Sequence, residues 1–237
     1  MKLFLSTKMK RLAIATISCL MAVTVQAQFY VNGGYLRSRR FIKNETSLAS
    51  LNAKQRSMKY DEDNNGFYIG ASYNMHFKEK GYGLEIGLDY VHERNASYRY
   101  YYPPLNGQPA GGQQWDWKSI DIPMLFNIGT DLTNQFRLKG FVGPTFVYRF
   151  SYEGNDELYR EYYSNAVQSV NIFATLGTSL EWNKLLRLKI GMDYCPFDMS
   201  VDGFGPLENT FGPLEKTYLT EWRVTVGLSV ILPETKK

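Results

Sequence analysis

The clearest hydrophobic pattern of the chain lies between residues 66 and 92, where apolar and polar side chains alternate along two segments. Each segment carries an apolar residue at every second position, with small or charged residues in between, and a short polar turn at 78–81 joins them. A period of two is that of a β-strand with two different faces. The pattern therefore predicts a β-hairpin, with strands over 66–77 and 82–92.

The same alternation recurs along the rest of the chain and predicts six more strands. One of them contains Pro123, which has no backbone N–H to donate to a neighbouring strand. We therefore expect a bulge or a locally unpaired position there. The six additional strands are predicted over residues 28–38, 115–128, 136–150, 170–182, 186–194 and 218–230.

Long and short connections alternate strictly between these strands. The strands have roughly the 10 residues or slightly more that a tilted membrane-spanning strand needs. Short turns on one side and long loops on the other are typical of a transmembrane β-barrel, with periplasmic turns and extracellular loops. The long connections are 39–65, 94–114, 151–169 and 196–217, and the short ones are 78–81, 129–135 and 183–185.

Aromatic residues mark both ends of the apolar face, as the interfacial aromatic girdles of membrane barrels do. A secreted soluble β-sandwich or a lipocalin-like barrel would also show alternation. The charged alternate face, the two aromatic rows and the loop asymmetry together favour the membrane barrel. The predicted fold is thus all-β, an eight-stranded antiparallel transmembrane β-barrel. The row at the short turns comprises Phe29, Phe77, Tyr82, Phe126, Phe136 and Trp182, and the row at the loops Tyr35, Phe67, Tyr90, Tyr148, Tyr194 and Tyr218.

The N-terminal segment 1–27 is predicted to be a cleaved signal peptide. A basic region ending at Arg11 precedes an apolar run, and small residues before Gln28 suit a signal peptidase. The apolar run is shorter than the roughly 20 residues of a spanning helix. A retained N-terminal anchor is the alternative. We expect residues 28–237 to form one barrel domain in the outer membrane of a Gram-negative bacterium, with both termini periplasmic.

Charge and cysteine content exclude several classes of function. The chain has 27 basic and 23 acidic residues, and the four basic residues of the predicted signal peptide would leave a neutral mature chain. Nucleic-acid binding normally relies on a basic excess, so no nucleic-acid partner is expected. Cys195 would be the only cysteine left, which allows neither an intrachain disulfide nor a cysteine-based metal site. We expect no metal and no cofactor.

Strand parity places many charged side chains inside the predicted barrel. An eight-stranded barrel is just wide enough for side chains to fill it, and charges in such a space must pair or draw in water. We expect a salt-bridge network that plugs the lumen, and a narrow ion path is the alternative. The predicted interior charges are Glu85, Asp89, Arg137, Lys139, Arg149, Glu181, Arg187, Lys189, Asp193, Glu221 and Arg223.

Tyrosines are concentrated in two of the predicted extracellular loops. Tyrosine offers amphipathic contact area of the kind used at binding interfaces. The leading hypothesis is therefore a non-enzymatic barrel with a structural or binding role through these loops. The alternative is that the rings extend the aromatic row or pack the loops together. The candidate binding residues are Tyr98, Tyr100, Tyr101, Tyr102, Tyr159, Tyr162 and Tyr163.

The segments Ser119–Leu125 (SIDIPML) and Gly140–Pro144 (GFVGP), within this strand pattern, resemble the outer-membrane β-barrel domain proteins of Bacteroidota, the PorT-like group. The similarity covers essentially the whole mature chain. It implies contact with outer-membrane lipid and lipopolysaccharide. Because some members take part in protein secretion, it also implies other envelope or secretion proteins as partners and a role as an accessory subunit of a secretion complex. The polar tail 234–237 departs from the C-terminal aromatic residue that is usual in such barrels.

A lipid-modifying barrel enzyme is a further alternative. Hydrolysis or acyl transfer would need a Ser or Thr beside a histidine and a carboxylate. The predicted mature chain offers only His76, near a short turn, and His92, near the loop end with Glu93 and Ser97 close by in sequence. The parity of His92 points it outward. We expect no catalytic site.

Overall fold

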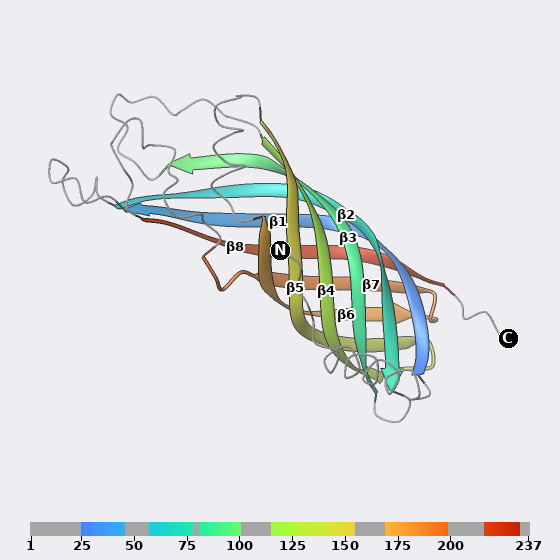
Figure 1. Ribbon diagram of the computed structural model, residues 1–237. Helices are drawn as coiled ribbons and strands as arrows, with labels where there is room; N and C mark the ends of the chain where they lie inside the picture. The colour runs from blue at the N-terminus through green and yellow to red at the C-terminus, as the bar shows by residue number, and fades with distance from the viewer. Residues whose placement is uncertain are drawn as a thin grey trace, which may run out of the picture.

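The computed structural model describes residues 25–45, 57–77, 81–100, 115–154, 169–198 and 216–232. They form eight β-strands in chain order (Figure 1). None of the described residues belongs to a helix long and apolar enough to cross a membrane. The strands are β1 (Val25–Glu45), β2 (Ser57–Phe77), β3 (Tyr82–Tyr100), β4 (Trp115–Asp131), β5 (Phe136–Gly154), β6 (Val170–Trp182), β7 (Leu186–Tyr194) and β8 (Lys216–Leu232).

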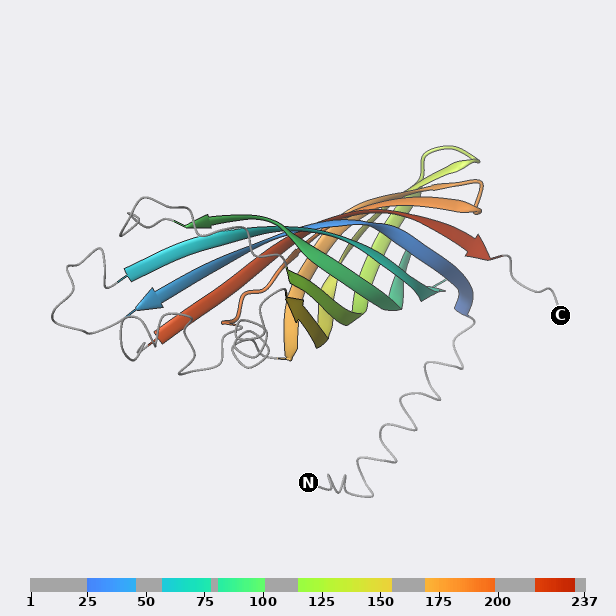
Figure 2. The same cartoon turned by 90° about the horizontal axis from the view of Figure 1, so that it is seen from above.

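The strands close into a single antiparallel barrel. Each strand pairs with its neighbours in sequence, and β8 returns to pair with β1 from Phe29↔Leu232 to Glu45↔Lys216. This confirms the predicted eight-stranded antiparallel all-β fold. In Figures 1 and 2 the strands are strongly tilted, and β1, β2, β3 and β8 reach beyond the others at one end. Closure leaves the middle of the sheet without a free edge.

Several strands are longer than predicted, so the connections 39–65 and 94–114 were predicted too long. β1 continues to Glu45 and pairs there with Ser57 of β2, while Tyr100 of β3 pairs with Tyr60. Backbone pairing does not require an apolar face, and these polar ends had lost the alternation on which the prediction depended. The four longer connections comprise residues 46–56, 101–114, 155–169 and 195–215.

The predicted irregularity at Pro123 is a local gap in strand pairing. β3 and β4 pair at Ile86↔Met124 and again at Asp89↔Asp121 in the same register, with no pairing in between. Gly87 lies opposite the proline, and a Cβ atom at Gly87 would come within 2.8 Å of Pro123 Cγ. The glycine therefore provides the space that the proline ring occupies.

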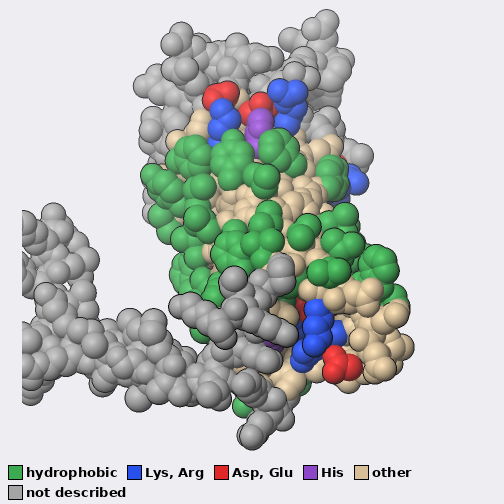
Figure 3. All heavy atoms as spheres, turned by 90° about the vertical axis from the view of Figure 1, so that its right-hand side faces the viewer, with side chains coloured by type: hydrophobic (Ala, Val, Ile, Leu, Met, Phe, Trp, Pro, Cys, Tyr) green, Lys and Arg blue, Asp and Glu red, His purple; other side chains and the backbone are tan. Residues whose placement is uncertain are grey.

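The apolar face of the sheet lies on the outside of the barrel. Large apolar side chains of every strand are exposed there, including Ile69 at 58% and Leu228 at 64%. Rings meet at both ends of this apolar belt: Phe77 and Tyr82 are 5.5 Å apart at the turn end, and Tyr90 and Phe150 are 6.4 Å apart at the loop end. Figure 3 shows the belt as a broad band of hydrophobic side chains.

The height of the belt follows from β2, where Phe67 and Phe77 mark its two ends. Their separation corresponds to roughly 34 Å along a strand and to about 26 Å when the strand is tilted by about 40°. That is close to the ~25 Å apolar band of transmembrane barrels.

Candidate functional site

A first cluster of charges fills the barrel near its loop end. We call it the loop-side cluster; it comprises Arg40, Glu93, Asp121, Arg149, Asp193, Glu221 and Arg223. Glu221 accepts hydrogen bonds at 2.7 Å from both Arg40 Nε and Arg149 Nη2, and Arg40 Nη2 lies 3.0 Å from Glu93. These four side chains come from β1, β3, β5 and β8, so the ion pairs tie separate parts of the wall together.

Arg223 is the centre of the loop-side cluster and is fully buried. Its guanidinium donates to Asp121 at 2.8 Å and lies 3.7 Å from Asp193. It is also 3.9 Å from both Glu93 and Glu221. One cation is thus surrounded by four carboxylates in a space with little water. Such burial is tolerated only when the charges neutralise one another.

Aromatic rings cover the guanidinium planes of this cluster. Arg223 lies 4.2 Å from the ring centroid of Phe173, and Arg40 lies 4.6 Å from that of Trp117. Arg149 is 5.8 Å from both rings. Cation–π contact suits a weakly hydrated guanidinium that is removed from water. The rings also fill the lumen between the ion pairs.

A second cluster lies nearer the short turns. We call it the turn-side cluster; it comprises Glu85, Lys139, Glu181, Arg187 and Lys189. Arg187 on β7 donates two hydrogen bonds to Glu85 on β3, at 2.5 and 3.2 Å. Lys189 lies 3.6 Å from the same carboxylate, and the guanidinium of Arg187 is 4.0 Å from the ring centroid of Tyr30. The contact between Arg187 and Glu85 spans the lumen.

The remaining pair of the turn-side cluster joins adjacent strands. Lys139 donates to Glu181 at 2.6 Å, and the Tyr30 hydroxyl donates to the same carboxylate at 2.9 Å. Gln28 lies 2.8 Å from His76 Nε2 at the edge of this group. The two clusters together contain six cations and six carboxylates. Their charges balance inside the barrel.

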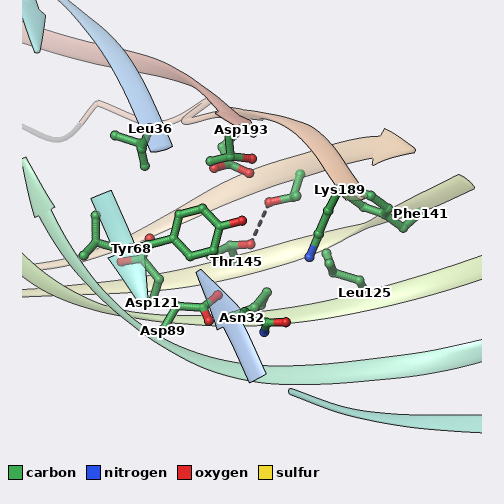
Figure 4. Close-up of a pocket in the computed structure, with 14 residues that line it drawn as sticks. Asn32, Leu36, Tyr68, Asp89, Asp121, Leu125, Phe141, Thr145, Lys189 and Asp193 are labelled. Carbon is green, nitrogen blue, oxygen red and sulfur yellow. Dashed lines mark hydrogen bonds between the residues drawn. The ribbon is translucent and has the colours of Figure 1, made fainter. Parts of the chain in front are cut away.

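A small cavity of about 50 Å³ separates the two clusters. Figure 4 shows Tyr68, Asp89, Lys189 and Asp193 around it. The hydroxyl groups of Thr145 and Thr175 form a hydrogen bond of 2.6 Å at its wall. At 10–15 Å³ for each water, the cavity has room for about four water molecules. It is too small to connect the two ends of the barrel as an open pore.

A larger hollow of about 330 Å³ opens at the turn end of the lumen. Its lining includes His76, Glu181, Arg137 and Lys184, so its walls are polar. Arg137 Nε lies 3.6 Å from Asp131. Glu181, which lines the hollow, also accepts the hydrogen bond from Lys139 of the turn-side cluster.

The structure places all eleven predicted interior charges on the inward side of the wall, and nine of them belong to the two clusters. The other two are Asp89, which lines the cavity, and Arg137, which lines the hollow. Sequence reasoning missed three members: Arg40 and Glu93, which lay just beyond the predicted strand ends, and Asp121. Continuing the alternation by two residues from Ser38 would have found Arg40.

The side chains of all seven candidate binding tyrosines lie outside the described part of the structure. The backbones of Tyr98 and Tyr100 belong to the outer end of β3 and pair with β2. Their side chains lie outside the described residues. The positions of Tyr101, Tyr102, Tyr159, Tyr162 and Tyr163 also lie outside the described part of the chain.

His92 lies on the outer surface, unlike His76, which lines the hollow at the turn end. His92 faces outward, 5.4 Å from the Phe67 ring and 3.2 Å from Asp116, whereas Glu93 points into the lumen. Hydrogen bonds from Arg94, and also from His92, hold the pKa of Asp116 below its usual range. Asp116 therefore stays ionised beyond the aromatic row. Among the described residues, no group of three His, Cys, Asp or Glu side chains is placed to hold a metal ion.

Comparisons with known proteins give only distant matches. No family model and no curated protein matches the chain. The outer-membrane protein OprG of Pseudomonas aeruginosa matches with a TM-score of 0.49 and 16% identity, over 89% of this chain and 98% of that one. Ail of Yersinia pestis matches with a TM-score of 0.39 and 11% identity, over 87% of this chain and 99% of that one. Neisserial surface protein A matches with a TM-score of 0.38 and 14% identity, over 86% of this chain and 98% of that one. At these values the likeness carries no argument about activity, and the fold rests on the strand pairing itself.

Proposed function

We propose that this chain is an integral outer-membrane β-barrel with a non-enzymatic, structural or binding role. The observation that carries the proposal is the reversal of its two faces. A closed sheet exposes its apolar side chains on the outside and buries five cations and six carboxylates within, with Lys189 half-buried beside them. Water would favour the opposite arrangement, whereas lipid favours this one and also requires a closed sheet.

The two ends of the barrel suggest its orientation. The strand ends that border the longer connections, 46–56, 101–114, 155–169 and 195–215, all lie at one end of the barrel, and β1 begins and β8 ends at the other. In this proposal the loop end is extracellular, both termini are periplasmic, and the apolar belt meets outer-membrane lipid and lipopolysaccharide. In this proposal the ion pairs that cross the lumen plug it, so the barrel is not a channel.

Membrane fractionation of the full chain expressed in a Gram-negative host tests this proposal. The protein is expected in the outer-membrane fraction after alkaline carbonate washing, with a gel mobility that changes on heating. Planar bilayers containing it should conduct no more than empty ones. A soluble periplasmic protein would refute the membrane location, and steady single-channel currents would refute the plug.

The binding role predicts a selective effect of the tyrosine cluster. Replacing Tyr98, Tyr100, Tyr101 and Tyr102 with serine is expected to reduce binding of the protein to its partner or surface, because amphipathic ring area is lost. Heat-modifiable mobility should not change, since the backbones of Tyr98 and Tyr100 lie at the outer end of β3, beyond the aromatic row. Cell-surface adhesion or pull-down, compared with the natural protein, measures the effect. Unchanged binding would leave the loops without an interface role.

The absence of catalysis is tested at the one outward histidine. His92→Ala is expected to leave lipid A and phospholipid profiles unchanged, because the only groups bound to His92 among the described residues belong to Asp116 and the Phe67 ring. Mass spectrometry of extracted lipids provides the measurement. A lost modification that returns with the natural gene would establish an enzyme instead.

A role as an accessory subunit of a secretion complex, as in the PorT-like group, is a second candidate. The two segments that carry this resemblance lie on the adjacent strands β4 and β5, where a Cβ atom at Gly143 would be only 2.1 Å from the carbonyl oxygen of Met124. Such close packing gives a reason for the glycine in the GFVGP segment. Co-purification from membranes in mild detergent distinguishes a complex subunit from a solitary barrel.

A further inference from the structure

Two exposed arginines flank an asparagine on the outer surface, directly beyond the loop-end aromatic row. In the sheet register Arg37 of β1 lies opposite Asn65 of β2, and Asn65 lies opposite Arg94 of β3. Neighbouring strands are about 4.8 Å apart, so the two arginines are roughly 10 Å apart with Asn65 between them. Their side chains are 58% and 65% exposed. Figure 3 shows basic, acidic and histidine side chains gathered at one end of the hydrophobic band.

Each of the three side chains retains hydrogen-bond donors for a ligand. Arg94 uses Nε and Nη2 to hold Asp116, at 2.9 and 3.2 Å, which orients the guanidinium and leaves its other N–H groups. The amide oxygen of Asn65 accepts a hydrogen bond from Tyr35, so the NH₂ group is the free part of the amide. Arg37 lies 3.7 Å from Asp63, beyond hydrogen-bond length.

Charge and apolar surface together indicate the kind of ligand. Among the described side chains of this surface, four cations stand against three carboxylates: Arg37, Arg39, Arg94 and Lys118 against Asp63, Asp116 and Glu153. On the membrane side the rings of Tyr35 and Phe67 are each 51% exposed. A free anion would make no use of these rings. An amphiphile with a phosphate beside its hydrocarbon chains would contact both surfaces.

We propose that Arg37, Asn65 and Arg94 bind the phosphate of a lipid headgroup in the leaflet at the loop end. The proposal rests on the membrane location proposed above. Guanidinium groups match phosphate oxygens with paired, charge-assisted hydrogen bonds, and the asparagine amide adds a donor between them. The bound lipid covers Tyr35 and Phe67 and fixes the depth of this side of the barrel in the membrane.

Lipid titration of the full-length barrel in nonionic detergent tests the site, with short-chain phosphatidic acid as the probe and isothermal calorimetry as the readout. The double variant R37Q/R94Q is expected to bind about tenfold more weakly, or worse, because it loses charge-assisted hydrogen bonds. The matched control R39Q/K118Q removes the same charge from the same surface but leaves both arginines beside Asn65. It should bind like the natural protein.

Three results would overturn the site. They are an unchanged affinity in R37Q/R94Q, an equal loss in both double variants, and competition by inorganic phosphate as strong as that of the lipid. The last would indicate a site for free anions. Heat-modifiable mobility is measured on the same samples, and neither double variant should alter it. If the natural chain fails to enter membranes but still binds phosphatidic acid in detergent, the membrane proposal fails separately from the site.

Discussion

Replacing Arg223 with methionine is expected to lower the free energy of unfolding of the barrel by about 3–5 kcal/mol. The substitution keeps much of the apolar volume but removes the one cation shared by four carboxylates, of which Asp121 is the nearest at 2.8 Å. Among the described residues, Arg223 is the only cation paired with Asp121 and Asp193, so both carboxylates would be left without a counter-ion. Urea titration of the protein folded in lipid vesicles, followed by tryptophan fluorescence and gel mobility, measures the loss.

Two further variants distinguish a buried-charge effect from a general effect of removing an arginine. Arg94→Met removes a 65% exposed guanidinium that pairs with Asp116, and solvent screening should make its effect much smaller. The double variant R223M/D121N should be less destabilised than the sum of its two single variants, because one stranded carboxylate is neutralised. Equal losses in R223M and R94M would contradict the idea of Arg223 as the centre of a buried network. If R223M does not fold, R223K gives a milder test: lysine keeps the charge but loses the planar guanidinium, so a smaller loss than in R223M and a larger one than in R94M is expected.

The architecture could be predicted because a barrel wall imposes one simple rule on the sequence. Residues alternate between the outer surface and the lumen, so the side on which positions such as Ile69 and Leu228 lie can be inferred from the pattern alone. The rule weakens where both faces are polar. The outer ends of β1, β2 and β3 therefore looked like loops, and Arg40 and Glu93 were lost with them.

The partners inside the barrel could not be predicted from the sequence. Glu181 and Arg187 lie on neighbouring strands, and alternation places both inside the barrel. Arg187 nevertheless binds Glu85 on the opposite wall, and Glu181 binds Lys139. These choices depend on how far each strand is shifted along its neighbour and on the length of each side chain across the lumen. The alternation of apolar and polar residues indicates neither the shift between strands nor the reach of a side chain across the lumen.

The aromatic rings within the lumen illustrate the same limit. Alternation places Trp117 and Phe173 on the inward face, but their use becomes clear only when the guanidiniums of Arg40 and Arg223 are found against them. The alternate face is thus a packed interior of rings and ion pairs rather than a wetted surface. Its packing explains how an apparently hydrophilic strand face can form the core of the molecule.

Leu228→Arg is expected to reduce the stability of the folded barrel in lipid by about 2–4 kcal/mol, the cost of a cation on the lipid face near the bilayer centre. Leu228 lies on the outer face, 64% exposed, opposite Gly33 of β1 and Leu188 of β7. No carboxylate lies opposite it in either neighbouring strand. The amount of protein in the washed outer membrane and the urea midpoint in vesicles should both fall.

The same substitution at Leu132 provides the control, because this leucine is 56% exposed but lies in the short turn between β4 and β5, outside the apolar belt. An arginine near the interface costs only about 0–1 kcal/mol, so Leu132→Arg should fold and insert like the natural protein. In water the two variants would behave alike, since an exposed arginine is well hydrated at either place. A large difference between them can therefore come only from the medium around the belt, and equal behaviour would mean that the belt faces water or protein instead of lipid.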